Sequence, residues 1–66
     1  MYGQRLRELR YEKKLSQRAL AEILGVTQKD ISRYELEQIE PNIGMIVKIC
    51  DYFEVTADFL LGRTDY

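Results

Sequence analysis

The stretch from Ser16 to Glu35 constrains the fold most, because it holds two short helical patterns joined by a tight turn. Ser16 is a typical N-cap residue, since its hydroxyl can accept a hydrogen bond from an amide of the following turn. Apolar residues then recur at helical spacing up to Gly25, a residue type that ends helices because it enters the left-handed region without a Cβ clash. Thr27 begins the second pattern, in which Asp30 can complete a capping box. Helices joined so closely cannot lie antiparallel, so we expect them to cross steeply as a helix-turn-helix.

The second helical pattern has a polar face that packing alone does not require. At about 100° per residue, four polar side chains share about 140° of the helix circumference. Ile31 and Tyr34 fall on the opposite side, where they can pack inward. Amide, hydroxyl, ammonium and guanidinium groups are those that read base edges in the major groove of DNA, although an ordinary solvated surface is the alternative interpretation. The four predicted base-reading residues are Gln28, Lys29, Ser32 and Arg33.

The whole pattern resembles the phage repressor and Cro-like (XRE-type) family of helix-turn-helix DNA-binding proteins. This resemblance implies an all-α, compact, five-helix, lambda-repressor-like domain that occupies residues 1–66 as a single unit. It also implies a sequence-specific transcriptional regulator, and we expect a repressor that acts by occluding a promoter. The matching residues are Gln17, Leu20, Ala21, Leu24 to Gln28, Ile31 to Glu35, Pro41 and Asp58 to Arg63.

The resemblance assigns roles to residues outside the polar face as well. It implies that the helix starting near Gln17 crosses the DNA backbone, while the helix starting near Gln28 enters the major groove. Arg10 is expected to form an ion pair with Glu35 that orients the reading helix, because this arginine is hard to bury alone. Amides at a helix start can also bind phosphate. The residues predicted to contact the DNA backbone are Gln17, Thr27, Asn42, Ile43 and Gly44.

Charge is distributed unevenly along a chain whose net charge is only −1. Residues 1–33 carry a net charge of +4 and residues 34–66 a net charge of −5. Since the local field steers a polyanion more than the total does, we expect the N-terminal half to face double-stranded DNA. One cysteine, no histidine and no long apolar run predict a cytoplasmic protein that is not an enzyme and has no metal, cofactor or membrane segment.

The remaining helices are expected to build the core. The first should span Gly3 to Lys14, and the fourth Ile43 to Phe53, with the broadest apolar face in the chain, including Ile43, Ile46, Val47, Ile49 and the core residue Cys50. Gly44 suggests a close backbone approach, and Glu54 stands where relatives often have glycine, so a positive φ would store strain there. After Thr56 a short helix should follow, and Leu61 and Tyr66 either close the core or form a dimer contact. A homodimer would place two reading helices roughly 34 Å apart on a palindromic operator.

The segment after Glu35 departs from the family pattern. Relatives commonly use polar or basic residues and glycine there to contact phosphates, whereas this chain has Leu36, Glu37, Ile39 and Glu40. We expect the two carboxylates to repel phosphates, and the two apolar residues either cover the core or form a patch for a partner. The alternative function is therefore a protein-interaction module of the same fold that binds a partner regulator and little or no DNA. A third interpretation is that the chain is the DNA-binding part of a longer repressor.

Overall fold

The chain folds into α-helices joined by short connections. The computed structural model describes residues 1–65, and within this range there are five helices and no strand. The predicted all-α, five-helix class is therefore confirmed. No helix among these residues is long and apolar enough to cross a membrane. The helices are α1 Tyr2–Glu12, α2 Gln17–Leu24, α3 Gln28–Glu35, α4 Ile43–Phe53 and α5 Ala57–Leu60.

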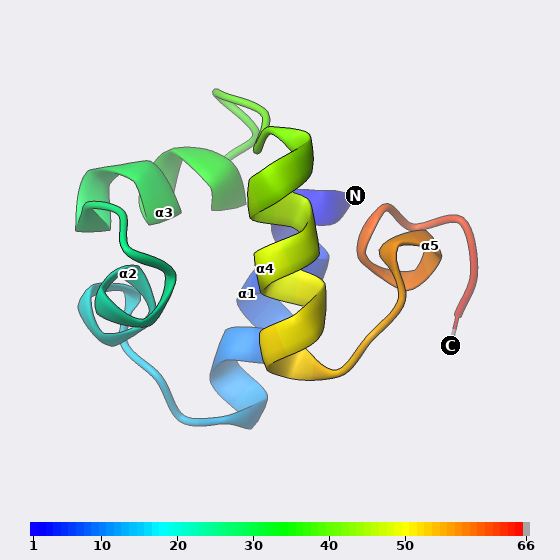
Figure 1. Cartoon of the computed structure of the whole chain (residues 1–66), viewed down its shortest axis with the longest axis horizontal. Helices are drawn as coiled ribbons and strands as arrows, with labels where there is room; N and C mark the ends of the chain where they lie inside the picture. Colours follow the sequence, from blue (N-terminus) through cyan, green and yellow to red (C-terminus); the bar gives the residue numbers. More distant parts are fainter. Residues whose placement is uncertain (66) are drawn as a thin grey trace.

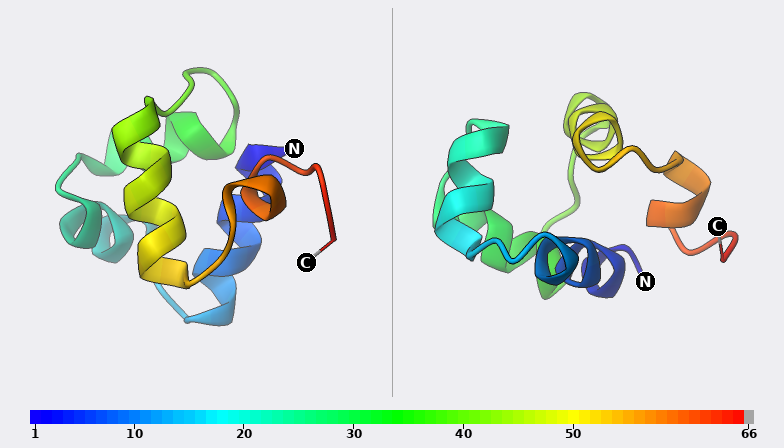
Figure 2. Two further views of the ribbon diagram at one scale, coloured as in Figure 1. Left: turned by 45° about the vertical axis from the view of Figure 1, so that its right-hand side comes forward. Right: turned by 90° about the horizontal axis from the view of Figure 1, so that it is seen from below.

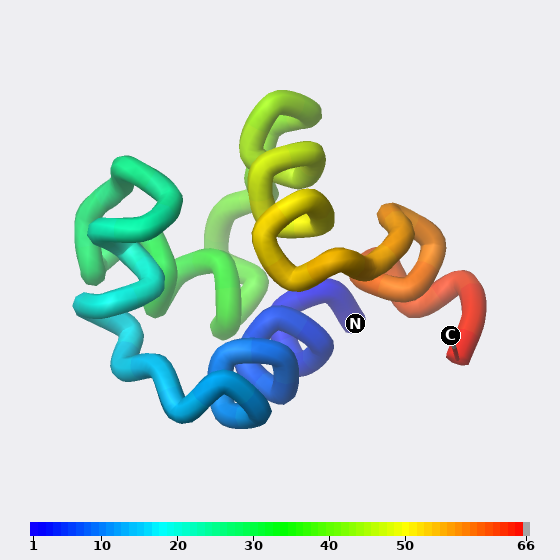
Figure 3. The backbone as a smooth tube through the Cα atoms, turned by 60° about the horizontal axis from the view of Figure 1, so that its bottom comes forward, coloured from blue at the N-terminus to red at the C-terminus, as the bar shows by residue number. Residues whose placement is uncertain are grey.

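The helices α2 and α3 cross steeply, as the short turn between them predicts. In Figure 1, α2 is seen almost end-on while α3 lies across the view. α4 passes in front of α1, with α2 and α3 on one side of this pair and α5 on the other, and the view from below in Figure 2 shows the same division. The tube in Figure 3 shows the start of α1 beside the α5 segment, and α1 and α5 are in contact.

The core draws on all five helices. Leu6, Leu20, Ile31, Ile49 and Leu60, one from each helix, are at most 1% exposed. Because Ile31 is completely buried, the inner face of α3 is fixed against this core. Its opposite face is thereby directed outward.

The apolar face of α4 is narrower than the sequence predicts. Ile49, Cys50 and Phe53 are buried, but Ile43 is 81% and Val47 52% exposed. On the helix wheel, at about 100° per residue, Ile43 and Val47 lie beyond Cys50, on the edge of the apolar face away from Ile49. The expectation that Ile43 and Val47 belong to the core is therefore wrong, whereas Cys50 is a core residue as predicted.

Residues in the left-handed backbone conformation, with positive φ, follow the ends of several helices. α1 ends at Glu12 instead of the expected Lys14, because Lys14 takes a φ of 56° and its amide bonds to the carbonyl oxygen of Tyr11 at 2.9 Å. Gly25 takes a φ of 75° at the end of α2, and Glu54 a φ of 56° at the end of α4. The positive φ considered for Glu54 is therefore present, and a side chain at this angle stores some strain.

A close backbone approach occurs at a different glycine from the one expected. A Cβ on Gly3 would lie 2.4 Å from the carbonyl oxygen of Glu35, so α1 and the end of α3 can meet only without a side chain at that position. A Cβ on Gly44 would have its nearest neighbour, Oδ1 of Asn42, at an ordinary 3.5 Å. Within residues 1–65, the expected close approach at Gly44 is therefore not found.

Candidate nucleic-acid interface

The outward face of α3 carries the polar residues predicted to read bases. Gln28, Lys29 and Arg33 are exposed, while Ser32 is half-buried. The opposite face buries Ile31. The structure thus presents three of the four side chains freely to solvent on one helix and partly covers the fourth.

A reciprocal cap fixes the start of α3. Oγ1 of Thr27 accepts a hydrogen bond from the amide of Asp30 at 3.1 Å, and Oδ2 of Asp30 accepts one from the amide of Thr27 at 3.2 Å. This is the capping box predicted from the sequence, with Asp in place of the usual Glu or Gln. The Thr27 hydroxyl is therefore engaged within the protein, and Gln28 follows it as the first helical residue.

The carboxylate of Glu35 is a buried hub at the other end of α3. Oε2 accepts a hydrogen bond from Nε of Arg10 at 2.6 Å, and Oε1 accepts one from the same guanidinium at 3.1 Å. Oε1 also accepts hydrogen bonds from Gln17 at 3.1 Å and, in a longer contact, from Nε of Arg7 at 3.5 Å. The remaining terminal nitrogen of Arg10 donates to the carbonyl of Leu15 at 2.9 Å. Glu35 thus connects α3 with both α1 and α2.

These contacts determine the charge state of Glu35. Burial raises the pKa of its carboxyl group, but hydrogen bonds from Arg10, Gln17 and Arg7 and the charge of Arg10 outweigh it, so the pKa lies below its usual range. The hydrogen bond to Glu35 raises the pKa of Arg10, against the opposing effect of burial. Both partners are therefore charged at neutral pH, and the structure contains the ion pair that the resemblance implied.

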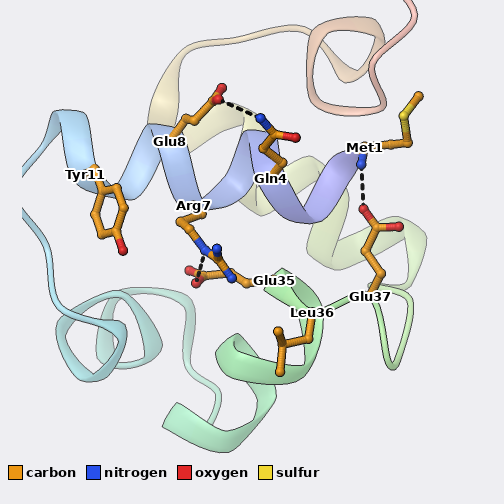
Figure 4. A pocket seen from close by; sticks show the side chains of 8 residues that line it. All are labelled: Met1, Gln4, Arg7, Glu8, Tyr11, Glu35, Leu36 and Glu37. Carbon is orange, nitrogen blue, oxygen red and sulfur yellow. Dashed lines mark hydrogen bonds and ion pairs between the residues drawn. The ribbon is translucent and has the colours of Figure 1, made fainter.

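Two donors to Glu35 were missed by the sequence reasoning. Gln17 was assigned only to the DNA backbone, yet its side-chain amide donates to Glu35. Arg7 was assigned no role, although it stands three residues before Arg10 and so shares a face of α1 with it. This spacing is the signal that could have indicated a second arginine at the same carboxylate. Figure 4 shows Arg7 directed at Glu35 from α1.

The start of α1 binds one carboxylate of the segment after α3. Oε2 of Glu37 accepts hydrogen bonds from the amide of Gly3 at 3.1 Å and from the amino group of Met1 at 2.6 Å, as Figure 4 shows for Met1. The amino group and then the Gly3 amide lower the pKa of Glu37. The sequence predicts that this carboxylate repels phosphates, and the structure adds that it is bound by the positive end of α1.

The neighbouring residues of this segment are exposed as well. Leu36 is 56% and Ile39 36% exposed, and Glu40 is exposed as well. Leu36 also borders an open hollow of about 580 Å³ between α1 and the end of α3 (Figure 4). Charged and amide groups along this hollow pair with one another, as Gln4 does with Glu8 at 3.2 Å. The exposure of Leu36 and Ile39 contradicts the alternative in which these two residues cover the core.

The start of α4 is exposed and capped. Oδ1 of Asn42 accepts a hydrogen bond from the amide of Met45 at 2.8 Å, while Ile43 and Gly44 are exposed. Of the two residues predicted to form a dimer contact, Leu61 is 38% exposed, and Tyr66 lies outside the described residues.

The thiol of the single cysteine, Cys50, is buried. Cys50 is only 9% exposed, and burial, followed by the charge of Asp51, raises the pKa of its thiol. Within residues 1–65 there is no group of three or more His, Cys, Asp or Glu side chains that could hold a metal ion.

The chain is similar to known proteins along almost its full length. Residues 3–65 match the family described as a helix-turn-helix domain. Over 64 residues the chain is 36% identical to YonR, an HTH-type transcriptional regulator derived from the SPbeta prophage of Bacillus subtilis, and over 65 residues it is 38% identical to YobD, an HTH-type transcriptional regulator of the same organism. These matches cover 97% and 98% of this chain but only 59% and 58% of the relatives, which are thus considerably longer.

Solved structures give the same result. The P22 c2 repressor, in complex with a synthetic operator, superimposes with a TM-score of 0.85 at 30% identity, covering 91% of each chain. The restriction-modification controller protein C.AhdI from Aeromonas hydrophila superimposes with a TM-score of 0.79 at 34% identity, covering 89% of this chain and 86% of that one. Together with the capping box and the steep crossing of α2 and α3, these similarities show that the chain belongs to the helix-turn-helix domain family.

Proposed function

We propose that this domain is a sequence-specific DNA-binding transcriptional regulator that reads the major groove of double-stranded DNA with α3. One observation carries the proposal: α3 buries Ile31 completely while Gln28, Lys29 and Arg33 are exposed on its other side. A helix of this size fits the major groove, where every base pair presents a distinct set of donors and acceptors. The regulators and the operator-bound repressor among its relatives support this role.

The polar side chains of α3 together suit the edges of more than one base. Gln28 can form two hydrogen bonds to adenine, and Arg33 or Lys29 can do so to the O6 and N7 atoms of guanine. Ser32 can bond to either base but is half-buried, so its reach is shorter. We therefore expect Gln28 and Arg33 to contribute most to specificity.

Contacts to phosphates would come from the starts of α2, α3 and α4. Gln17 has an amide hydrogen and an oxygen left after its bond to Glu35, so it can serve both partners. In the caps of Thr27 and Asn42 only the side-chain oxygens are used, as acceptors, so the Thr27 hydroxyl hydrogen and the Asn42 amide hydrogens can still be donated to a phosphate. The backbone amides of Ile43 and Gly44 at the exposed start of α4 are further donors. These contacts would fix the register without reading sequence.

The proposal extends to how copies of the domain assemble on DNA and how their binding affects transcription. We infer a cytoplasmic repressor that binds a palindromic operator as a homodimer and blocks a promoter. The name of the P22 c2 repressor supports repression, and the exposed Leu61 after α5 supports an apolar contact between two copies. In such a dimer the two copies of α3 would lie roughly 34 Å apart, which is one turn of DNA.

The rival proposal is a protein-interaction module with the same fold. The exposed Leu36 and Ile39 and the carboxylate of Glu40 favour it, because they replace residues that would otherwise approach phosphates. Selection of bound sites from random duplexes, followed by titration of a selected duplex at several salt concentrations, distinguishes the two. We expect log Kd to rise with log salt concentration by about 0.9 for each phosphate contacted. Failure to enrich any duplex, or a slope near zero, would instead support the interaction module.

A further inference from the structure

A lysine of α4 closes the end of α2. Nζ of Lys48 donates a hydrogen bond to the carbonyl oxygen of Leu24, the last residue of α2, at 2.9 Å. The same nitrogen lies 3.6 Å from the position that a Cβ on Gly25 would take. The last turn of α2 itself contains no basic residue. The cation at this helix end is therefore supplied by another helix.

The physical effect of this contact follows from the local backbone. The last four carbonyls of a helix have no partner in the helix, and the C-terminal end carries a partial negative charge. Here the amides of Gly25 and Val26 both bond to the carbonyl of Ala21, at 3.0 Å for Val26, while the carbonyl of Leu24 accepts its bond from Lys48. Lys48 thus ties α4 to the first residues of the turn that leads into α3.

We propose that Lys48 is a positioning residue that fixes the turn between α2 and α3, and with it the polar face of α3, relative to the start of α4. This proposal rests on the proposed function, in which α3 and the α4 start contact one duplex. Lys48 stands four residues after Gly44, about 6 Å further along the helix, so one side chain links the end of α2, directly before the turn into the reading helix, to the helix whose start would bind phosphate. Without this link the two contact regions can shift independently, which weakens binding that needs both in register.

The first test uses the protein without DNA. Lys48→Met keeps the length of the side chain but removes its charge and donors, and Arg63→Met is the matched control because Arg63 pairs only at the surface, 3.6 Å from Asp58. Hydrogen exchange at the amides of Gly25 and Val26 should become about tenfold faster in Lys48→Met, as expected for loss of a partly exposed charge-assisted hydrogen bond. The amide of Leu20, earlier in α2, should exchange as before, and so should all these amides in Arg63→Met.

The second test measures positioning on DNA. For the duplex selected by the wild-type protein, relative to an unrelated duplex, we expect the affinity ratio of Lys48→Met to fall about tenfold with an unchanged salt slope, and Lys48→Arg to restore it. A uniform loss on both duplexes, with a salt slope lower by about 0.9, would overturn the proposal in favour of a phosphate contact. A lower melting temperature with an unchanged ratio and unchanged exchange would overturn it in favour of stability alone.

The two proposals can fail separately. If the wild-type protein binds no duplex, the proposed function is wrong, and the positioning of α3 for DNA is wrong with it. The exchange experiment still shows in that case whether Lys48 holds the turn.

Discussion

The helices α3 and α4 begin with the same kind of cap but expose chemically different side chains to solvent. Each has an N-cap residue, Thr27 or Asn42, whose side-chain oxygen accepts a hydrogen bond from the amide three residues further on. Yet the exposed face of α3 carries amide and cationic groups, whereas that of α4 carries Ile43 and Val47. Cap signals therefore locate a helix, but they do not indicate what it shows to solvent. Packing partners decide that, and an apolar residue can remain outside when none is available.

The two helices are also held in place differently. The end of α3 is fixed by polar groups, since Arg10, Gln17 and Arg7 all donate to the buried Glu35. α4 is held mainly by apolar burial of residues such as Ile49, which is 0% exposed. Removal of a single hydrogen-bond donor should therefore disturb α3 strongly, while changes on the exposed side of α4 should have little effect.

The largest effect is expected from Arg10→Met. This variant leaves the carboxylate of Glu35 buried with only Gln17 and the distant Arg7 as donors, and removal of one partner from a buried ion pair costs about 3–5 kcal/mol. Urea unfolding of both proteins would measure the difference in the free energy of unfolding. DNA binding should weaken as well, because α3 loses its orientation.

A double variant separates ion pairing from packing. Arg10→Met with Glu35→Met replaces the pair by apolar side chains of similar volume, so we expect it to recover at least half of the lost stability. Arg63→Met, which removes an exposed pair, should change stability by no more than about 0.5 kcal/mol. Equal stability of Arg10→Met and the wild type would show that the pair does not hold α3.

Acid should reveal the same carboxylate. The pKa of Glu35 is lower in the folded than in the unfolded state, so its contribution to stability is present above the ordinary glutamate pKa and is lost as the pH falls through the folded value. As the pH falls below the ordinary glutamate pKa, the free energy of unfolding of the wild type should therefore fall more steeply than that of Glu35→Gln. Parallel curves for the two proteins in urea unfolding from pH 7 to pH 3 would contradict this assignment.

A smaller effect is expected where α1 meets the end of α3. In Gly3→Ala the new methyl group would lie 2.4 Å from the backbone oxygen of Glu35, so one of the two helices must move. Overpacking of this kind costs about 1–3 kcal/mol, which thermal unfolding would measure. Gly44→Ala is the matched control and should not destabilise, because its nearest contact is an ordinary 3.5 Å. Similar losses at both glycines would contradict the close approach.

The smallest effect is expected on the exposed side of α4. Val47→Thr exchanges a half-exposed methyl group for a hydroxyl and should change the free energy of unfolding by less than about 0.5 kcal/mol. At the buried Ile49, Ile49→Thr replaces an ethyl group by a hydroxyl and should cost at least about 2 kcal/mol. Comparable costs at the two positions in urea unfolding would show that Val47 is not a surface residue.

The sequence predicted those parts of the fold that depend on local chemistry. Ser16 and Thr27 cap helices because their hydroxyls reach amides only three residues away, and Gly25 ends α2 because it can take a positive φ. The Arg10–Glu35 pair was predicted because the chain resembles a known family. The caps and the glycine turn do not require knowledge of how distant segments pack, whereas the Arg10–Glu35 pair joins distant segments and came only from the resemblance.

Other features that depend on distant segments were not predicted. The close approach of Gly3 to Glu35 and the bond between Glu37 and the start of α1 arise only once α1 lies against the end of α3. Similarly, the exposure of Ile43 and Val47 depends on which neighbours cover α4, which periodicity alone does not reveal. The polar residues of α3 were predicted as one face, and the structure adds that Ser32 is partly buried while the other three are exposed.

The central claim is that the exposed face of α3 reads bases, and Gln28→Ala tests it most directly. The affinities of wild type and variant would be measured on the selected duplex and on a set of duplexes that each change one base pair. We expect Gln28→Ala to lose about 1–3 kcal/mol of binding free energy and to become indifferent to one base-pair position while keeping the wild-type preferences elsewhere. An equal loss on every duplex, or no loss on any, would contradict the claim.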